Sequence, residues 1–360
     1  MVLRKAVMSC GESEIGDHKQ LREELSDMIT IGEIAQKAGV SKATVSRVVN
    51  NSGYVREETR NKIEAIIEEY RYTPSAAAQN LSRQQTNTIG VIVPELENAF
   101  FTEVLTGISQ ILDQEGLTML MCNTSNNKEK EKEALLTLEQ QRVRGVIFTS
   151  AGQYSSEEEA QSVQELLRKL NAPVVVVDRE IDNIPWDCVY YENFKAGYLA
   201  AQRLIKRGKK QLGILLGDLK HQHGRERYEG FCQALKDYGL ELNPAFVYHG
   251  DYLQEKAYEV TKRALKCKED CADGLVICNN LMFMGYLKAK AESGWKPGGE
   301  PLPIVAIDHI PTLDMIEYPY ECVTRDMKEM GREAIRLLLK RFENPDKERE
   351  ISMIPCEERY

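Results

Sequence analysis

From residue 88 onward, short apolar segments alternate with longer amphipathic segments. The short segments have the size of strands, as in TIGVIVPEL (88–96) and APVVVVDRE (172–180), whereas FTEVLTGISQILDQEG (101–116) has helical spacing. Strands that alternate with helices form parallel sheets covered by helices. The alternation continues to PLPIVAID (301–308), the last strong strand. There are too many strands for one ordinary sheet, so we expect an α/β fold with two lobes of doubly wound parallel sheet and a cleft between them.

A different pattern precedes this region. Residues 31–50 read IGEIAQKAGVSKATVSRVVN, in which Gly39 separates two short helical segments. Glycine adopts positive φ at little cost and often ends a helix. Ser41 is a good N-cap for the second segment, whose apolar stripe is Val45, Val48 and Val49. The pattern predicts a helix-turn-helix, with an ordinary helical hairpin as the less favoured alternative.

A third helix is expected at EETRNKIEAIIEEY (57–70), because its isoleucines recur at helical spacing. It would complete a three-helix head. Pro74 ends the next extended piece, and SAAAQNLS (75–82) could form about two helical turns, which is marginal for an isolated helix in water. The following SRQQTNT has the composition of a linker.

Charge is distributed unevenly between the head and the remainder. The whole chain of 360 residues carries a net charge of −9, whereas residues 28–85 hold eight Lys/Arg and six acids. The head is therefore +2 and the remainder −11. A mildly basic head on an acidic body is typical of a protein that makes one small nucleic-acid contact.

Nine cysteines are scattered along the chain without a CxxC pair. Cys267 and Cys271 could share one helix face, but free thiols in a reducing cytosol are favoured over a zinc site. The sequence shows no apolar run long enough to cross a bilayer and no apolar signal core, so we expect a cytoplasmic protein. Residues 1–27 are polar and unpatterned, which indicates either a disordered extension or a wrongly assigned start codon.

Six motifs follow one another in the order found in one protein family. They are the helix-turn-helix, YTPSAAAQNL (72–81), NAFF (98–101), RYEGF (227–231), CNN (278–280) and IVAID (304–308). From about Ile29 to its end, the chain resembles the lactose-repressor (LacI/GalR) family of bacterial transcription regulators. The resemblance implies a hinge helix after the head and a core like periplasmic binding proteins. The expected division is 28–74 for the DNA-binding head and 75–87 for hinge and linker. Residues 88–190 with 323–350 form the first lobe, and residues 191–322 with 351–360 form the second.

The resemblance also implies which residues contact DNA. Lys42, Ala43 and Arg47 would face base edges in the major groove, where Arg pairs with guanine and an Ala methyl packs on thymine. Leu81 stands where the family's hinge helix inserts a leucine into the minor groove, although plain helix-pair packing is an alternative. Expected phosphate contacts are Ser41, Thr44, Ser46 and Asn50, and the predicted set is completed by Thr30, Tyr72 and Ala78. Ser75 replaces the Asn of many members, which weakens that hinge contact.

Ligand contacts implied by the resemblance lie at strand ends that border the cleft, where ligands of open α/β sheets bind. The predicted residues are Asn98, Phe101, Asp178, Arg179, Arg227, Asn279 and Asp308. Carboxylates, amides and arginine suit a polyhydroxylated ligand, since each hydroxyl both donates and accepts. Asn280, which stands where Asp is more usual, and Glu192 are better interpreted as capping or turn residues. Trp186 and His223 could supply a stacking face or a donor, or could be loop residues.

These expectations describe a repressor whose operator binding is controlled by a small molecule, most commonly a sugar in this family. Alternatives within the family are a global catabolite regulator with a phosphoprotein co-effector and a purine-responsive repressor. A transport-type sugar-binding protein is disfavoured by the DNA head. No GxGxxG, P-loop, GxSxG or HExxH motif occurs, so no enzyme, catalytic residue, metal or cofactor is expected. No leucine heptad follows the core, which favours a homodimer over a tetramer.

Overall fold

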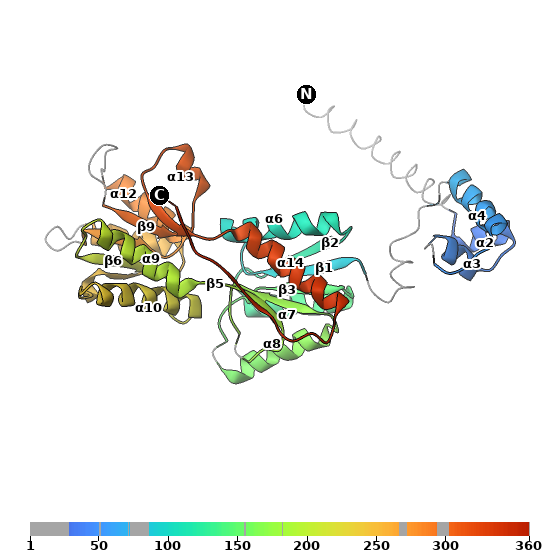
Figure 1. Ribbon diagram of the computed structural model, residues 1–360, viewed down its shortest axis with the longest axis horizontal. Coiled ribbons are helices and arrows are strands. Elements are labelled where there is room, and N and C mark those ends of the chain that lie inside the picture. The colour runs from blue at the N-terminus through green and yellow to red at the C-terminus, as the bar shows by residue number, and fades with distance from the viewer. Residues whose placement is uncertain are drawn as a thin grey trace, which may run out of the picture. The chain divides into compact units, whose positions relative to one another are not determined.

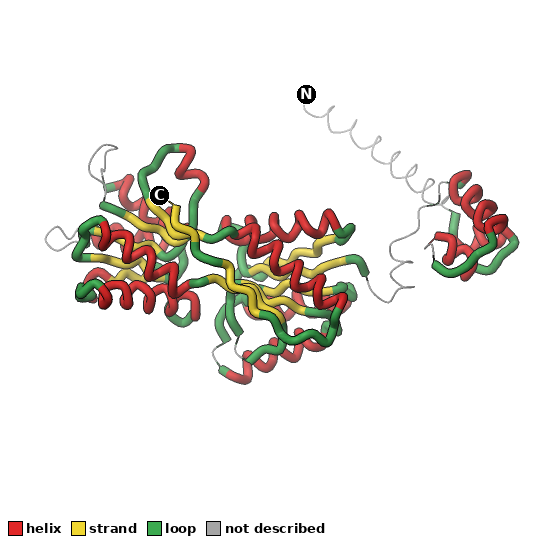
Figure 2. The backbone as a smooth tube through the Cα atoms, in the orientation of Figure 1, coloured by secondary structure: helices red, strands yellow, loops and turns green. Residues whose placement is uncertain are grey.

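The structure of the chain is a computed structural model, which describes residues 29–49, 52–70, 72, 86–154, 156–181, 183–265, 272–293 and 302–359. It divides into two compact units, residues 1–84 and residues 85–360. Figure 1 labels their helices and strands, and Figure 2 shows the same elements by type. The predicted hinge helix at residues 75–82 and the Cys267–Cys271 pair lie outside the described residues.

The head of the first unit consists of α2 (Ile31–Ala38), α3 (Lys42–Val49) and α4 (Glu57–Glu69). Between α2 and α3, Gly39 has a φ of 70°, the left-handed conformation expected for the turn. A small core of buried side chains joins the three helices: Ile29, Ile34, Ala35, Ala38, Val45, Val48 and Ile63. The spacing of these apolar residues therefore builds the predicted three-helix head.

The second unit begins with a lobe whose sheet has the strand order β11-β5-β4-β3-β1-β2. Its strands are β1 (Thr88–Val93), β2 (Thr118–Asn123), β3 (Gly145–Phe148), β4 (Val174–Val177), β5 (Asp187–Tyr191) and β11 (Ile351–Ile354). Its helices are α6 (Ala99–Gln114), α7 (Lys128–Gln140), α8 (Glu157–Lys169) and α14 (Met327–Glu343). Strand residues pack on α6 and α14 across one face and on α7 and α8 across the other (Figure 1). Both faces are covered, which explains the continuous apolar runs.

The second lobe has the strand order β12-β10-β9-β8-β6-β7, in which only β12 is antiparallel to its neighbour among the described pairings. Its strands are β6 (Leu212–Leu216), β7 (Val247–His249), β8 (Gly274–Ile277), β9 (Ile304–Ile307), β10 (Glu321–Thr324) and β12 (Glu357–Arg359). Its helices are α9 (Asn193–Lys206), α10 (Gln222–Asp237), η1 (Pro244–Phe246), α11 (Gln254–Ala264), α12 (Asn280–Glu292) and α13 (Pro311–Met315). The predicted pair of parallel-sheet lobes is confirmed.

The chain passes between the lobes after β5, after β10 and after β11. The expected division placed residues 351–360 in the second lobe, and this is wrong for 351–354. Strand β11 pairs in parallel with β5, with Ile351 opposite Cys188, so it belongs to the first lobe. Only β12 belongs to the second. The expected boundary at residue 323 also falls inside β10. The residues of edge strand β11 differ in exposure along the strand, so it lacks the continuous apolar run by which other strands were predicted.

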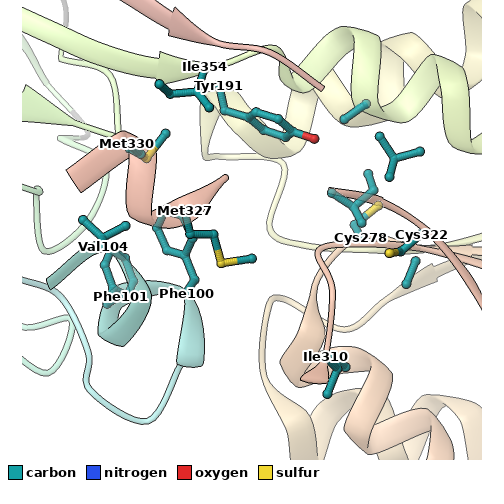
Figure 3. Packing of buried hydrophobic residues seen from close by; sticks show 14 of the residues in the cluster. Phe100, Phe101, Val104, Tyr191, Cys278, Ile310, Cys322, Met327, Met330 and Ile354 are labelled. Carbon is teal, nitrogen blue, oxygen red and sulfur yellow. The ribbon is translucent and has the colours of Figure 1, made fainter. Parts of the chain in front are cut away.

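Apolar side chains from both lobes meet where the chain crosses. Figure 3 shows Phe100, Phe101 and Val104 of α6 beside Met327 and Met330 of α14. A single contiguous core cluster continues through Tyr191 into the second lobe. Apolar packing therefore joins the two lobes where the chain crosses between them, next to the cleft. No helix in the described ranges is both long and apolar enough to span a membrane.

Candidate functional site

The outer face of α3 displays the cationic and small residues predicted from the sequence. Lys42, Ala43 and Arg47 are exposed, whereas Val45 and Val48 face the head core. The Ser41 hydroxyl accepts a hydrogen bond from the Thr44 amide at 3.2 Å and so caps α3. The N-terminal amides of α3 and a positive side-chain surface suit the approach of a phosphate backbone.

Other residues predicted to contact DNA have structural partners in the head. Thr30 forms a capping box with Glu33 at the start of α2. Tyr72 is partly buried against the head core, and Ser46 is partly exposed on α3. Asn50, Ala78 and Leu81 lie outside the described residues.

In the second unit, one cavity of about 690 Å³ collects all seven residues predicted to bind a ligand. They come from both lobes, and the first and last of them, Asn98 and Asp308, are 210 positions apart in the sequence. Those from the first lobe are Asn98, Phe101, Asp178 and Arg179, and those from the second are Arg227, Asn279 and Asp308. The carboxyl ends of the strands in both sheets therefore face one shared space.

The backbone conformation at the strand ends positions the predicted polar side chains in the cavity. Asn98 and Asn279 are N-caps of α6 and α12, with their side-chain oxygens accepting from Phe100 and Met282 amides. Asp178 and Asp308 directly follow β4 and β9, at φ values of 66° and 79°. Non-glycine residues in this left-handed region are uncommon and tend to cluster at functional sites. Equivalent carboxylates in the two lobes thus take the same unusual backbone conformation.

Arg227 is buried in α10 and held from two directions. Its Nε donates to Asn193 Oδ1 at 2.9 Å, and its Nη1 donates to the Cys278 carbonyl. Helix α9 lies so close that a Cβ at Gly197 would stand 2.0 Å from the Arg227 carbonyl oxygen. The reciprocal contact places a Cβ at Gly230 1.9 Å from the Phe194 carbonyl oxygen. These two glycines therefore allow the helix contact that positions Arg227.

A residue that the sequence did not reveal, Arg325, also lines the cavity. Its guanidinium stands 4.2 Å from the ring centroids of both Phe100 and Tyr191. It also lies 3.6 Å from a carboxylate oxygen of Asp178 in one lobe and of Asp308 in the other. Arg325 Nε and Nη1, together with Asp308 Oδ1, are buried without a hydrogen-bond partner among the described residues. These atoms can bind a ligand that both donates and accepts hydrogen bonds.

Aromatic rings form another wall of the cavity. His221 and His223 stack with centroids 5.2 Å apart, and the His223 ring lies 4.9 Å from that of Tyr252. Burial and the nearby Arg179 lower the pKa of His221, and burial, with Arg227 nearby, lowers the pKa of His223 well below its usual range. Both imidazoles are therefore uncharged at neutral pH. The Tyr252 hydroxyl is buried without a partner in the described chain.

Four residues with open interpretations can now be placed. His223 lines the cavity, whereas Trp186 lines a separate pocket beside Pro345. The N-cap of α12 is Asn279 rather than Asn280. Asn280 Oδ1 accepts from the Leu281 amide at 2.8 Å in the first turn of the same helix, and its Nδ2 donates to Asn98 in the other lobe. Glu192 occupies the N-cap position of α9 without a side-chain cap bond, and its carboxylate instead accepts from the Cys356 amide at 3.0 Å.

The chemistry of the cavity suits recognition of a polar molecule. Carboxylates, guanidinium groups and amides offer acceptors and donors on several sides, and the ring stack offers an apolar face. The cavity continues into a second chamber of about 770 Å³, which shares Tyr154, Arg179 and the two stacked histidines. Among the described residues, no group of three or more His, Cys, Asp or Glu is arranged to hold a metal ion.

Comparison with known proteins gives two family matches. Residues 30–75 match bacterial regulatory proteins of the lacI family, and residues 86–356 match periplasmic binding proteins and the sugar binding domain of the LacI family. The HTH-type transcriptional repressor PurR of Pasteurella multocida (strain Pm70) is 32% identical over 324 residues, covering 90% of this chain and 95% of the relative. PurR of Haemophilus influenzae (strain PittEE) is also 32% identical, covering 89% and 93%.

Solved structures show the same arrangement of elements. A lac repressor dimer bound to operator and the anti-inducer ONPF is 25% identical, with a TM-score of 0.76, over 92% of this chain and 98% of that one. A LacI family regulator from Enterococcus faecium with bound ribose is 27% identical, with a TM-score of 0.66, over 76% and 97%. The regulator CelR in complex with cellobiose is 24% identical, with a TM-score of 0.66, over 92% and 98%, and shows the fold alone.

Proposed function

Because the chain belongs to the LacI family of bacterial regulatory proteins, we propose that it is a transcriptional repressor controlled by a small molecule held between its lobes. The observation that carries the proposal is the convergence on one cavity of the seven side chains that the family resemblance implies, in a chain that also has a helix-turn-helix head. The head would bind DNA, and the two-lobed core would bind the small molecule. A change in lobe angle on ligand binding would alter operator binding, with coupling of about 1–3 kcal/mol.

At the DNA, α3 would lie in the major groove as the recognition helix. Lys42, Ala43 and Arg47 are exposed on it and would read base edges, while Ser41, Thr44 and Ser46 would hold phosphates. Thr30, Asn50 and Tyr72 would add backbone contacts. Ala78 and Leu81 would belong to a hinge that enters the minor groove.

A homodimer would present two heads to a pseudo-palindromic operator, because each recognition helix reads one half-site. The related lac repressor was solved as a dimer on its operator. Action on bacterial DNA would place the protein in the cytoplasm. A regulatory role without enzymatic activity also agrees with the absence of a common catalytic motif from the sequence.

A sugar or sugar derivative is the effector that the cavity favours. Asp178, Asp308 and Asn279 can accept from hydroxyl groups, and Arg227 and Arg325 can donate to them. The rings of His223 and Tyr252 could pack on the apolar face of a pyranose. Two relatives in the fold hold ribose and cellobiose, respectively.

A purine is the second candidate, because the relatives with 32% identity are PurR repressors and a stacked aromatic wall also suits a planar base. A thermal-shift screen of sugars, sugar phosphates and nucleobases would separate these classes. A ligand at a hundred times its Kd adds about 2.7 kcal/mol to the free energy of unfolding.

Selection of bound fragments from genomic DNA, with and without each stabilising compound, completes the test. The proposal expects a preferred fragment whose affinity changes with one stabilising compound. A protein that prefers no fragment at any ionic strength, with or without compounds, would overturn it.

A further inference from the structure

We propose that Asn280 is an inter-lobe positioning residue, whose amide latches the second lobe to the first at the edge of the ligand cavity. Asn280 is the first residue of α12 in the second lobe, and Asn98 is the N-cap of α6 in the first. Asn280 Nδ2 donates to Asn98 Oδ1 at 3.0 Å, and both side chains are buried. A buried hydrogen bond that joins two lobes favours the lobe angle at which it can form.

The direction of this hydrogen bond is fixed by Glu95. A carboxylate only accepts, so Asn98 must turn its Nδ2 toward Glu95 Oε1, which lies 3.1 Å away. Asn98 Oδ1 therefore faces the Phe100 amide at 3.1 Å and the Asn280 side chain. The group at position 280 must be a donor. An aspartate of nearly the same shape would place an acceptor against an acceptor in a buried site.

The same hydrogen bonds continue into the wall of the cavity. Glu95 Oε2 accepts from Asn126 Nδ2 at 3.1 Å, and Asn126 Oδ1 accepts from Arg179 Nη2 at 3.0 Å. Glu95, Asn98, Asn126 and Arg179 all line the cavity. A ligand oxygen that draws Arg179 or Glu95 toward itself would alter the chain that ends at Asn280. Lobe angle and ligand occupancy are therefore linked at this contact.

The latch can be tested without a known ligand by amide hydrogen exchange of the full-length protein. Asn280→Asp is compared with Asn243→Asp, a control in the same lobe. The Asn243 side-chain oxygen caps η1 by accepting from the Ala245 amide at 3.0 Å, a role that a carboxylate can also fill. Asn280→Ala, which removes the donor without adding charge, serves if the aspartate variant does not fold in a urea titration.

Loss of the latch is expected to speed exchange about tenfold in the first turns of both α12 and α6, which is the effect of one lost buried hydrogen bond. Asn243→Asp should leave both segments unchanged. Faster exchange confined to α12 would mean that Asn280 acts only within its own helix, and this would overturn the proposal. So would unchanged exchange in both segments of a folded variant.

The coupling to the cavity rests on the proposed function, so it is tested separately by operator and effector titrations of the same variants. Asn280→Asp should shift the affinity for the selected operator and the affinity for the compound found in the thermal-shift screen, whereas Asn243→Asp should shift neither. Changed exchange with unchanged affinities would retain the latch and overturn its link to the cavity. Absence of any operator or compound for the wild-type protein would count against the proposed function, and hydrogen exchange would still decide the latch.

Discussion

Arg47 projects from the exposed face of α3, away from the buried residues Val45 and Val48. If it donates to a base edge, Arg47→Ala should lose about 1–3 kcal/mol of discrimination between operator and random duplex. Fluorescence anisotropy at fixed salt measures both affinities. Lys62→Ala removes the same charge from an exposed position of α4. It should lower the affinities for the operator and for the random duplex about equally. Equal discrimination by Arg47→Ala and wild type would remove Arg47 from the base contacts.

Asp308 lines the ligand cavity, and its Oδ1 has no hydrogen-bond partner among the described residues. Asp308→Asn should preserve the left-handed backbone, which asparagine tolerates, but weaken acceptance from a ligand hydroxyl. We expect operator binding without effector to remain. The effector concentration that gives half of the maximal change in operator binding should rise at least tenfold. Asp113→Asn, on the exposed surface of α6, is the matched control. A normal response in Asp308→Asn would exclude this carboxylate from the site.

The difference between predicted and missed side chains has a physical reason. Asp178 and Asp308 follow strongly apolar runs, so the ends of their strands are visible in the sequence. Arg325 follows the short strand β10 and enters the cavity only because the chain recrosses between the lobes there. No local pattern predicts such a crossing. The inter-lobe contact of Asn280 was not predicted, because its partner, Asn98, lies in the other lobe.

At the scale of elements, the contact between α9 and α10 depends on the absence of a side chain at Gly197. Gly197→Ala would push a methyl group against the Arg227 backbone, so either the helices separate or Arg227 shifts. We expect a loss of about 1–3 kcal/mol in the free energy of unfolding, as for other overpacked sites. Urea denaturation measures it.

Gly152→Ala is the control for this substitution, since its added methyl would meet only the end of Lys128 at 3.9 Å. Its free energy of unfolding should stay within about 0.5 kcal/mol of wild type. If Gly197→Ala were equally stable, the close approach of α9 and α10 would not constrain the fold.

Most elements of the lobes were predictable because apolar strands and amphipathic helices differ in hydrophobic period. The last strands were not. Ile351 and Met353 of β11 are about half exposed, and β12 is formed by the polar residues Glu357–Arg359. Both are edge strands whose pairing is set by the sheets they join. Both strands are only three or four residues long, too short for a hydrophobic period to distinguish them from loops.

For the molecule as a whole, the stacked histidines predict how stability depends on pH. The folded protein keeps His221 and His223 uncharged because their pKa values lie below the usual value of about 6.5, whereas the unfolded chain binds protons normally. Their contribution to stability is complete above about pH 6.5 and is lost as the pH falls toward their folded pKa values. The slope is at most about 1.4 kcal/mol per pH unit for each proton.

Urea titrations between pH 5 and 8 measure this dependence. His223→Gln, which cannot be protonated, should have a smaller slope than the wild type between about pH 6.5 and 5. Other charged or titratable side chains line the same cavity as the stack: Arg179, Arg225, Arg227, Arg325, Asp178, Asp218 and Tyr252. They are the same in the variant and in the wild type, so a difference between the two slopes comes from the substitution. An unchanged slope in His223→Gln would show that this imidazole is not the titrating group.

The first lobe is assembled from two separated stretches of chain, because α14 and β11 join strands that were completed more than a hundred residues earlier. During translation, residues 88–191 emerge from the ribosome well before the helix and edge strand that cover them. The nascent first lobe must therefore wait, with part of its apolar surface unshielded, until the whole second lobe has been synthesised. Such a delay exposes it to chaperones and proteases, and slow codons near residue 320 would lengthen that exposure.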